Sequence, residues 1–533
     1  MPTSPATPVL PTHTDVLIVG SGPAGLTLAA SLRRLGVDHV LIDRNPGTRS
    51  GSRAAAVQPG ALEYLDRIGV TPELIRAGKR GRGFRLHDRE RTLLRAPYDG
   101  LDTPYPFVLL ASQQTTEEQL LCRLEELGGR VYRSHTYLGH AAQFPGVAAT
   151  VAGPDGVLRA ISARYLVGCD GVHSAVRTTA GIGFPGEAPE ELLFALADVR
   201  LVSGDENPSG TGPGNASTTG YDEASRDDTT FFLSPSGMLL LSPLADDRHR
   251  IVSPAAPDGT APGVAAVQQM LSERGPLKGA LRVAEVVSAA TYRVQERVAE
   301  RFRAGPVLLA GDAAHTHSPA GGQGMNTGIQ DAGNLAWKLH AVLDMAAPEA
   351  LLDSYHRERH PVAAALVAFT GQFARLANLR DTAAGQRRNG LLAAAATAPG
   401  VTDWIATRLA QLDVDYTQES APRDPQEPPD GSPRVGERIS PLTVPASGLR
   451  WTLALPVHGT SSDGRPADRY GSGTPADKDP ADRHGPLAVR YVPGLPATLL
   501  VRPDGYLAAR GVPADPDDVL ERLREYLPSA ASR

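Results

Sequence analysis

Cysteine is almost absent from this chain. The 533 residues include two cysteines, Cys122 and Cys169, so a disulfide framework and a thiolate-based metal site are both excluded. No apolar run approaches the ~18 residues that a membrane-spanning helix requires. Residues 1–12 carry no basic segment followed by an apolar one, so no export signal is expected. The sequence therefore favours a soluble, cytoplasmic protein.

An excess of positive charge is also missing. The formal net charge is −6, so no global basic field would attract nucleic acid. Hydrophobic residues make up 41% and charged residues 21%, which is typical of a globular protein with ample core material. At about 150 residues per domain, the length predicts three or four domains. We expect a small-molecule partner, with no nucleic acid and no membrane.

The N-terminal part reads as a strand, a glycine-rich turn, a helix and a second strand. The apolar run 15–19 leads into Gly20-Ser-Gly22-Pro-Ala-Gly25, and the second strand ends at Asp43. In such a turn the glycines permit a tight bend, close approach of a pyrophosphate, and close helix packing, while the acid binds ribose hydroxyls. This unit predicts a dinucleotide site and leaves open whether the ligand is NAD or FAD.

Two distant glycine-rich segments decide between these dinucleotides. One is Gly168-Cys-Asp170-Gly171, at the end of a predicted strand. The other runs from Gly311-Asp312 through Pro319 to Asn326 and enters a predicted helix. A loop of this kind can lay several backbone N–H groups along a flat polar ligand, with the helix dipole behind them.

Together, in this order, these segments resemble the single-component FAD-dependent aromatic hydroxylases, flavoprotein monooxygenases related to p-hydroxybenzoate and phenol hydroxylases. The resemblance extends from Asp15 to about Arg510 and is strongest to the bacterial aromatic polyketide hydroxylases. It implies non-covalent FAD, NADPH as reductant and O₂ as co-substrate. The implied reaction is hydroxylation of a polycyclic aromatic, polyketide-type substrate through a C4a-hydroperoxyflavin, by a monomer or homodimer.

The resemblance also assigns roles to residues. The FAD pyrophosphate falls to Gly20, Gly22 and Gly25, and the adenosine ribose to Asp43, where the family usually has glutamate. Arg53 and Pro319 are expected near the flavin and are the candidates for a direct catalytic contribution. The remaining implied cofactor-binding residues are Arg44, Gln113, Asp170, Gly311, Asp312, Gly322, Gly324, Met325 and Asn326.

Substrate-binding residues are harder to assign from sequence. The candidates are Tyr221, Phe231, Met238 and Tyr292, with His87 and Tyr98 as further possibilities, and ordinary packing is the alternative explanation for each. His315 and His317 do not predict a metal site, because two histidines at this spacing have no third ligand nearby.

The predicted fold class is α/β. A Rossmann-like FAD-binding domain carries an inserted α+β substrate domain with a β-sheet, and a C-terminal thioredoxin-like α/β domain follows. The predicted boundaries are 1–13 for a disordered N-terminus, 14–80, 111–190 and 293–412 for the FAD-binding domain with a helical extension, 81–110 and 191–292 for the substrate domain, 413–434 for a linker, and 435–533 for the thioredoxin-like domain. Polar loops are expected at 203–228 and 458–486. No cysteine follows Cys169, so the last domain cannot perform thiol chemistry.

Other functions remain open at this stage. The same scaffold could carry out Baeyer–Villiger oxygen insertion or modify an antibiotic, and no residue type in the sequence separates these reactions from hydroxylation. A non-catalytic flavin-binding scaffold in a biosynthetic complex is a more remote alternative. A pyridine-nucleotide disulfide reductase is excluded, because no paired cysteines follow the first glycine-rich helix.

Overall fold

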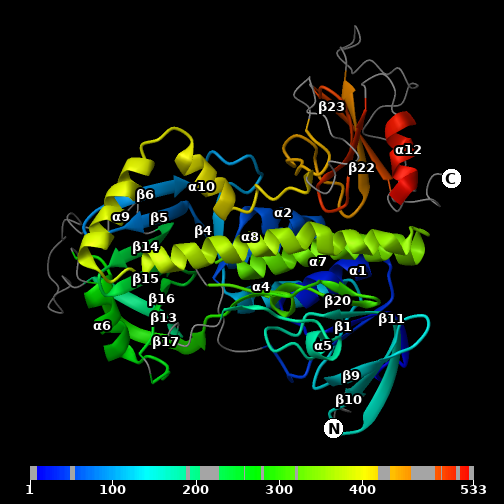
Figure 1. Cartoon of the computed structure of the whole chain (residues 1–533), viewed down its shortest axis with the longest axis horizontal. Helices are drawn as coiled ribbons and strands as arrows, with labels where there is room; N and C mark the ends of the chain where they lie inside the picture. The colour runs from blue at the N-terminus through cyan, green and yellow to red at the C-terminus, as the bar shows by residue number, and fades with distance from the viewer. Residues whose placement is uncertain are drawn as a thin grey trace.

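Figure 1 shows the computed structural model of the chain. The structure describes residues 9–48, 55–187, 193–203, 227–256, 258–277, 281–318, 322–417, 433–457, 487–493, 495–511 and 517–526. Arg53, Pro319, Tyr221 and most of the two predicted polar loops lie outside the described residues.

The first sheet is built around a buried central strand. Its main path runs β19 (Arg303–Ala304), β20 (Val307–Leu309), β11 (Leu158–Gly168), β1 (His13–Val19), β2 (His39–Ile42) and β8 (Val131–Tyr132). β1 is parallel to both β11 and β2, and Val16, Leu17 and Ile18 are fully buried. A continuous apolar run suits a parallel strand that is covered on both faces. The strand–helix–strand unit expected from the sequence is present.

Helices and a hairpin complete this part of the molecule. α1 (Pro23–Leu35) packs against α7 (Gly324–Asp344), α2 (Pro59–Arg67) packs against α7, and α4 (Gln113–Glu126) packs against α1. The predicted hairpin is formed by β10 (Val147–Ala152) and the first half of β11, and β9 (Thr136–Ala142) extends it. The short helices α3 and α5 span Thr71–Ala77 and Ala175–Thr179.

The second sheet is largely antiparallel. Its order is β17 (Leu281–Arg293), β13 (Leu193–Ser203), β16 (Arg248–Pro254), β15 (Gly237–Pro243), β14 (Asp228–Ser234), β5 (Gly83–His87) and β6 (Thr92–Pro97). Side chains alternate between the two faces of a strand. Phe231 therefore belongs to one apolar cluster and Phe232 to another, which also contains side chains of α6 (Val264–Arg274).

Two small sheets lie between the larger ones. One has the order β3 (Ala56–Val57), β7 (Val108–Leu110) and β4 (Lys79–Gly81), and the other β12 (Gly186–Glu187), β18 (Glu296–Val298) and β21 (His315–Thr316). Strand β3 brings the segment after residue 55 next to the second sheet.

Two of the helices after α7, α9 (Thr382–Ala395) and α10 (Val401–Leu409), pack on strand β6 of the second sheet. They follow α8 (Asp353–Ala377) and lie over β5 and β6 in Figure 1. Ala377, Ala406 and Leu409 share an apolar cluster with Phe231. The grouping of these helices with the FAD-binding part stays a prediction, because helical periodicity shows which face is apolar and not which sheet that face covers. None of the described helices is long and apolar enough to cross a membrane.

The C-terminal unit packs on α2, α7 and α8. Its sheet has the order β23 (Leu487–Pro493), β22 (Trp451–Val457), β24 (Thr498–Val501) and β25 (Leu507–Gly511), and α12 spans Asp517–Tyr526. Trp451 meets Trp337 of α7 edge to face at 5.4 Å. Tyr416, in the predicted linker, is buried and lies 4.3 Å from the ring of Tyr506.

A buried ionic cluster joins this unit to the rest of the chain. The Glu358 carboxylate accepts hydrogen bonds from both terminal nitrogens of Arg502, at 2.9 and 2.8 Å, and from the Lys338 ammonium at 2.9 Å. Asp504 accepts hydrogen bonds from the guanidinium of Arg502 and from the side-chain amide of Asn334. Burial would raise the pKa of Glu358, but the charges of Arg502 and Lys338 outweigh it and hold that pKa far below its ordinary value of 4.5.

We expect Glu358→Gln to lower the free energy of unfolding by about 3 kcal/mol near pH 7, because two buried cations lose their common anion. Since the folded-state pKa is depressed, the advantage of the native chain is present above pH 4.5 and shrinks as the pH falls below that value. Denaturant melts of both proteins across this range measure the difference. Glu118→Gln, on the exposed side of α4, is the matched control and should change stability little.

Candidate functional site

The glycine-rich turn after β1 combines tight packing with open space. A Cβ at Gly25 would lie 1.9 Å from the carbonyl oxygen of Gly20, and one at Gly20, where φ is +102°, would lie 2.4 Å from that of Cys169. At Gly22 a Cβ would meet nothing within 4 Å. No side chain caps the N-terminus of α1. Backbone donors at the start of a helix, beside open space, fit a pyrophosphate.

Asp43, the acid at the end of β2, is positioned by hydrogen bonds from neighbouring residues. One oxygen of Asp43 accepts the backbone N–H and the hydroxyl of Ser21 at 2.7 and 2.8 Å, and the other accepts two donors of Asn45. Arg133 donates to the Ser21 hydroxyl at 2.7 Å. Sequence analysis missed Arg133, which follows β8 and reaches this place because β8 pairs with β2. Arg44 is exposed beside the acid.

The turn after β20 is fixed by a buried carboxylate. Gly311, with φ +62°, and the exposed Asp312 form a short 3₁₀ turn. The N–H of Gly311 donates to Asp331 of α7 at 3.2 Å, and Asp331 also contacts His315 and Arg359, each at 2.7 Å. Burial would raise the pKa of Asp331, but Arg359 and His315 outweigh it and keep that pKa below its ordinary value.

The start of α7 is tied to the segment before α2 by one amide. Asn326 accepts the N–H of Gln58 at 2.8 Å and donates to the carbonyl oxygens of Ala56 and Gly322 at 2.9 and 2.7 Å. The side chain of Asn326 thus binds the chain itself. No side chain caps this helix N-terminus, so the backbone N–H groups from Gly324 onward are the donors available to a ligand.

Two histidines lie behind this helix start. Burial and the neighbouring His315 lower the pKa of His317 to about 4, so His317 is neutral at pH 7. A Cβ at Gly324 would lie 2.7 Å from Nε2 of His317, which leaves no room for a larger residue at the first position of the helix. Met325 is half-buried beside it.

The side chains of Asp170 and Gln113 make hydrogen bonds to residues close to them in the chain. The carboxylate of Asp170 accepts the hydroxyl of Ser174 at 2.5 Å and two N–H groups at the start of α5. Its backbone lies against Gly20. Gln113 is the first residue of α4 and donates to Glu117 at 2.8 Å.

These features form a row along one edge of the first sheet. The turn at Gly22, the acid Asp43, the turn at Asp312 and the start of α7 all follow the carboxyl ends of parallel strands or the loop after them. An elongated anionic dinucleotide binds at such an edge. The described residues therefore fit FAD, with Gly322 at the far end of the row.

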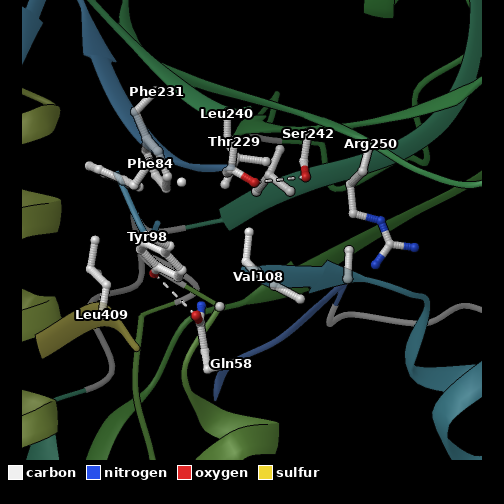
Figure 2. Close-up of a pocket in the computed structure, with 15 residues that line it drawn as sticks. Gln58, Phe84, Tyr98, Val108, Thr229, Phe231, Leu240, Ser242, Arg250 and Leu409 are labelled. Atoms are coloured by element: carbon white, nitrogen blue, oxygen red, sulfur yellow. Dashed lines mark hydrogen bonds between the residues drawn. The ribbon is translucent and has the colours of Figure 1, made fainter. Parts of the chain in front are cut away.

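A cavity of about 600 Å³ begins at that end, between the loop that contains Gly322 and the second sheet. Figure 2 shows the side chains that surround it. Its lining consists of Ala55, Ala56, Gln58, Gly83, Phe84, Tyr98, Val108, Thr229, Phe231, Leu240, Ser242, Arg250, Val252, Gly322 and Leu409.

The cavity has an aromatic end and a polar end (Figure 2). Phe84 and Phe231 lie 5.0 Å apart at one end, and Arg250 lies at the other. The hydroxyls of Thr229 and Ser242 are 3.0 Å apart between them. This arrangement suits a flat, largely apolar molecule that carries a few oxygen atoms.

Polar wall residues are held by partners. Two nitrogens of Arg250 donate to Asp198 at 2.7 and 2.8 Å, and the Tyr98 hydroxyl donates to Gln58 at 3.2 Å. Sequence analysis missed Arg250 and Asp198, whose pairing depends on the register of β13 and β16.

Some of the candidate substrate residues line the cavity, and others lie outside its lining. Phe231 and Tyr98 line the cavity. Met238 and Tyr292 belong to the same apolar cluster as Phe231, outside the cavity lining. His87 packs against Phe232, 5.3 Å between ring centres.

Comparisons with known proteins agree on a family. Residues 13–370 match the family model described as an FAD binding domain. An uncharacterized aromatic compound monooxygenase of Bacillus subtilis, YhjG, is 32% identical over 407 residues, which cover 75% of this chain and 76% of the relative. The 12-dehydrotetracycline 5-monooxygenase/anhydrotetracycline 6-monooxygenase of Streptomyces rimosus is 34% identical over 533 residues, with 96% and 98% covered. The solved structure of the anhydrotetracycline hydroxylase OxyS, from Streptomyces rimosus, superposes with a TM-score of 0.72 at 28% identity, covering 97% of this chain and 99% of that one.

A pair of glycine variants tests the turn after β1. Gly22→Ala should fold normally, since its Cβ meets nothing within 4 Å, yet bind FAD more weakly, because the methyl group occupies the space for the pyrophosphate. Gly25→Ala should lose both thermal stability and FAD, because its Cβ clashes with backbone. Circular dichroism melts and flavin absorbance measure the two effects. Full flavin content in Gly22→Ala would contradict this assignment.

Asp312→Ala should retain the fold and lose much of its FAD, because Asp312 is exposed at the cofactor edge and its removal leaves ribose hydroxyls without an acceptor. Acid precipitation should release the flavin of the native protein completely into the supernatant, as expected for non-covalent FAD. Asp353→Ala, an exposed carboxylate on α8, is the control and should keep its flavin. Equal flavin occupancy in both variants would refute the role of Asp312.

Proposed function

Since the chain belongs to the FAD-binding domain family and is an FAD-dependent aromatic monooxygenase, we propose that it hydroxylates a polycyclic aromatic, polyketide-type small molecule bound in the cavity beside Gly322. The observation that carries this proposal is the position of the cavity. It opens where the row of cofactor-binding features ends, and two phenyl rings form its far wall.

The shape and chemistry of the cavity support a fused-ring substrate. Phe84 and Phe231 offer aromatic faces and edges, which stabilise aromatic ligands through offset or edge-to-face contact. Thr229, Ser242 and Arg250 offer groups that can bind phenol or carbonyl oxygens at the opposite end. Relatives named for anhydrotetracycline and 6-methylpretetramide support a substrate of this class.

The protein and its cofactor divide the chemistry. When bound, FAD receives electrons from NADPH and activates O₂, and the chain binds, orients and shields the reactants. The uncapped N-terminus of α7 would stabilise negative charge on the flavin ring through its backbone N–H groups. Apolar walls formed by Val108, Leu240 and Leu409 would limit access of water to the reacting atoms. Arg53 and Pro319 remain proposed neighbours of the flavin.

We also infer that the C-terminal unit is thioredoxin-like in fold and structural in role. β22 and β23 are parallel, β24 and β25 are antiparallel to their neighbours, and α12 packs on β24 and β25. The unit has no cysteine, so thiol–disulfide exchange within it is chemically impossible. The proposed domain boundaries are those given by the sequence, with α9 and α10 assigned to the substrate side because of their packing.

NADPH oxidation by the flavin-loaded protein should be slow alone and should accelerate at least about tenfold with a matching polycyclic phenol, with one oxygen atom added to the product. The reason is that flavin reduction without a substrate would end only in wasteful peroxide, so we expect reduction to stay slow until a substrate fills the cavity. A stopped-flow or spectrophotometric assay with product mass measures this. NMR of the product distinguishes a hydroxyl group from the ring expansion of Baeyer–Villiger insertion.

Two variants locate the substrate. Leu240→Trp enlarges a side chain that lines the cavity and should abolish the stimulation while FAD remains bound. Leu391→Trp makes the same change at a position 72% exposed on α9 and should leave the stimulation intact. If both variants respond like the native protein, the substrate binds elsewhere.

A further inference from the structure

A second cavity lies at the seam between the C-terminal unit and helices α2 and α7. Its volume, including the part open to solvent, is about 440 Å³. Its lining consists of Gly60, Glu63, Tyr64, Arg67, Gln330, Gln411, Tyr416, Arg438, Asp504, Gly505 and Tyr506. The proposed oxygenation reaction does not use this cavity.

Both carboxylates that line this cavity are already paired. Glu63 binds Arg438 through both of its oxygens and accepts the hydroxyl of Thr103 at 2.8 Å. Asp504 binds Arg502 through both of its oxygens, the nearer contact being 2.6 Å.

The neutral polar groups of the lining are paired as well. The hydroxyl of Tyr416 accepts Arg359 at 3.1 Å, and that of Tyr64 contacts Ser31 at 2.9 Å. The amide of Gln330 donates to Gln411 at 2.9 Å.

Arg67 differs from all of them. It is the last residue of α2 and only 5% exposed. Its Nη2 atom lies beside Gly505, 2.7 Å from where a Cβ would stand, so the guanidinium reaches the cavity wall formed by the C-terminal unit. No hydrogen bond or ion pair joins its side chain to any residue within the part of the chain that the structure describes. Glu63 and Asp504 attract it only over a longer range.

The buried carboxylates at this seam each already have another cation as partner, and Asp66, next to Arg67 in the chain, is exposed. Glu63 balances Arg438, and Asp331 balances Arg359. The pair Glu358 and Asp504 balances the pair Lys338 and Arg502. A buried cation without a partner is costly, and a guanidinium fork matches the oxygens of a carboxylate or phosphate.

We propose that this cavity binds a small oxyanion, a carboxylate or phosphate group, through Arg67. The anion supplies the direct partner that Arg67 lacks among the described residues. It also connects the end of α2 with the turn at Gly505, so its occupancy stabilises the attachment of the C-terminal unit. The α2 helix begins directly after Gln58, which lines the substrate cavity, so the anion site and the reaction site share one rigid element.

The test is a titration of the flavin-loaded, full-length protein with sodium phosphate or sodium acetate, with sodium chloride adjusted to keep the ionic strength constant. Binding to the folded state should raise the melting temperature in proportion to the logarithm of the anion concentration above the dissociation constant, by about 1 °C at ten times that constant. Phosphate and acetate in separate arms distinguish the two sources of oxyanion. Chloride alone should give a smaller rise, because it cannot engage both nitrogens of the fork.

Arg67→Gln should abolish this rise. Arg76→Gln removes the same charge from an exposed position on α3, where the side chain is 68% exposed, and should preserve the rise. If Arg67→Gln does not fold, Arg67→Lys keeps the charge without the planar fork and should need at least about fivefold more phosphate for the same rise.

Two results would overturn the proposal. The native protein could show no rise with either anion beyond the rise with chloride, in which case water alone fills the cavity. Alternatively, Arg67→Gln could respond as the native protein does, which would indicate general exclusion of salt from the surface.

Discussion

The carboxylate of Asp331 is the interaction on which the arrangement of this molecule depends. It is fully buried in α7 and holds the turn after β20 through the N–H of Gly311. It also binds Arg359 of α8, which donates to the Tyr416 hydroxyl, and the ring of Tyr416 packs at a tilt against Tyr506 of the C-terminal unit. A buried carboxylate with several strong donors allows one geometry, since loss of any donor leaves charge uncompensated. The cofactor edge and the C-terminal unit are thus held by the same group.

The turns along the edge of the first sheet could be predicted from the sequence because their constraints are local, while the cofactor roles of their residues stay predictions. Gly20 and Gly25 are required by contacts with residues close in the turn or on the adjacent strand, and the apolar run of β1 marks a strand buried on both faces. Asp43 and Asp312 follow strands whose ends meet at one edge of a parallel sheet. Such features repeat wherever the same turn is built, so a pattern of residue types is sufficient to find them.

The substrate cavity could not be predicted in this way. Its walls come from separate strands, and whether a side chain faces the cavity depends on strand register, so that Phe231 lines it and Phe232 does not. The pairing of Arg250 with Asp198, and the position of Arg67 at the seam, arise from contacts between residues far apart in the chain. Tyr416 falls in a stretch whose composition resembles a linker, yet long-range packing buries it.

The two sides of the proposed substrate cavity differ in the size of their side chains. On the side next to the start of α7 stand Ala55, Ala56 and Gly322, small residues beside a backbone that Asn326 holds in place. On the sheet side stand larger side chains on separate strands, such as Phe84 and Leu240. Evolution can therefore exchange one sheet residue at a time and reshape the space for a new molecule without disturbing the oxidising machinery. The range of compounds in the names of relatives, from anhydrotetracycline to pentachlorophenol, is the diversity that such modularity permits.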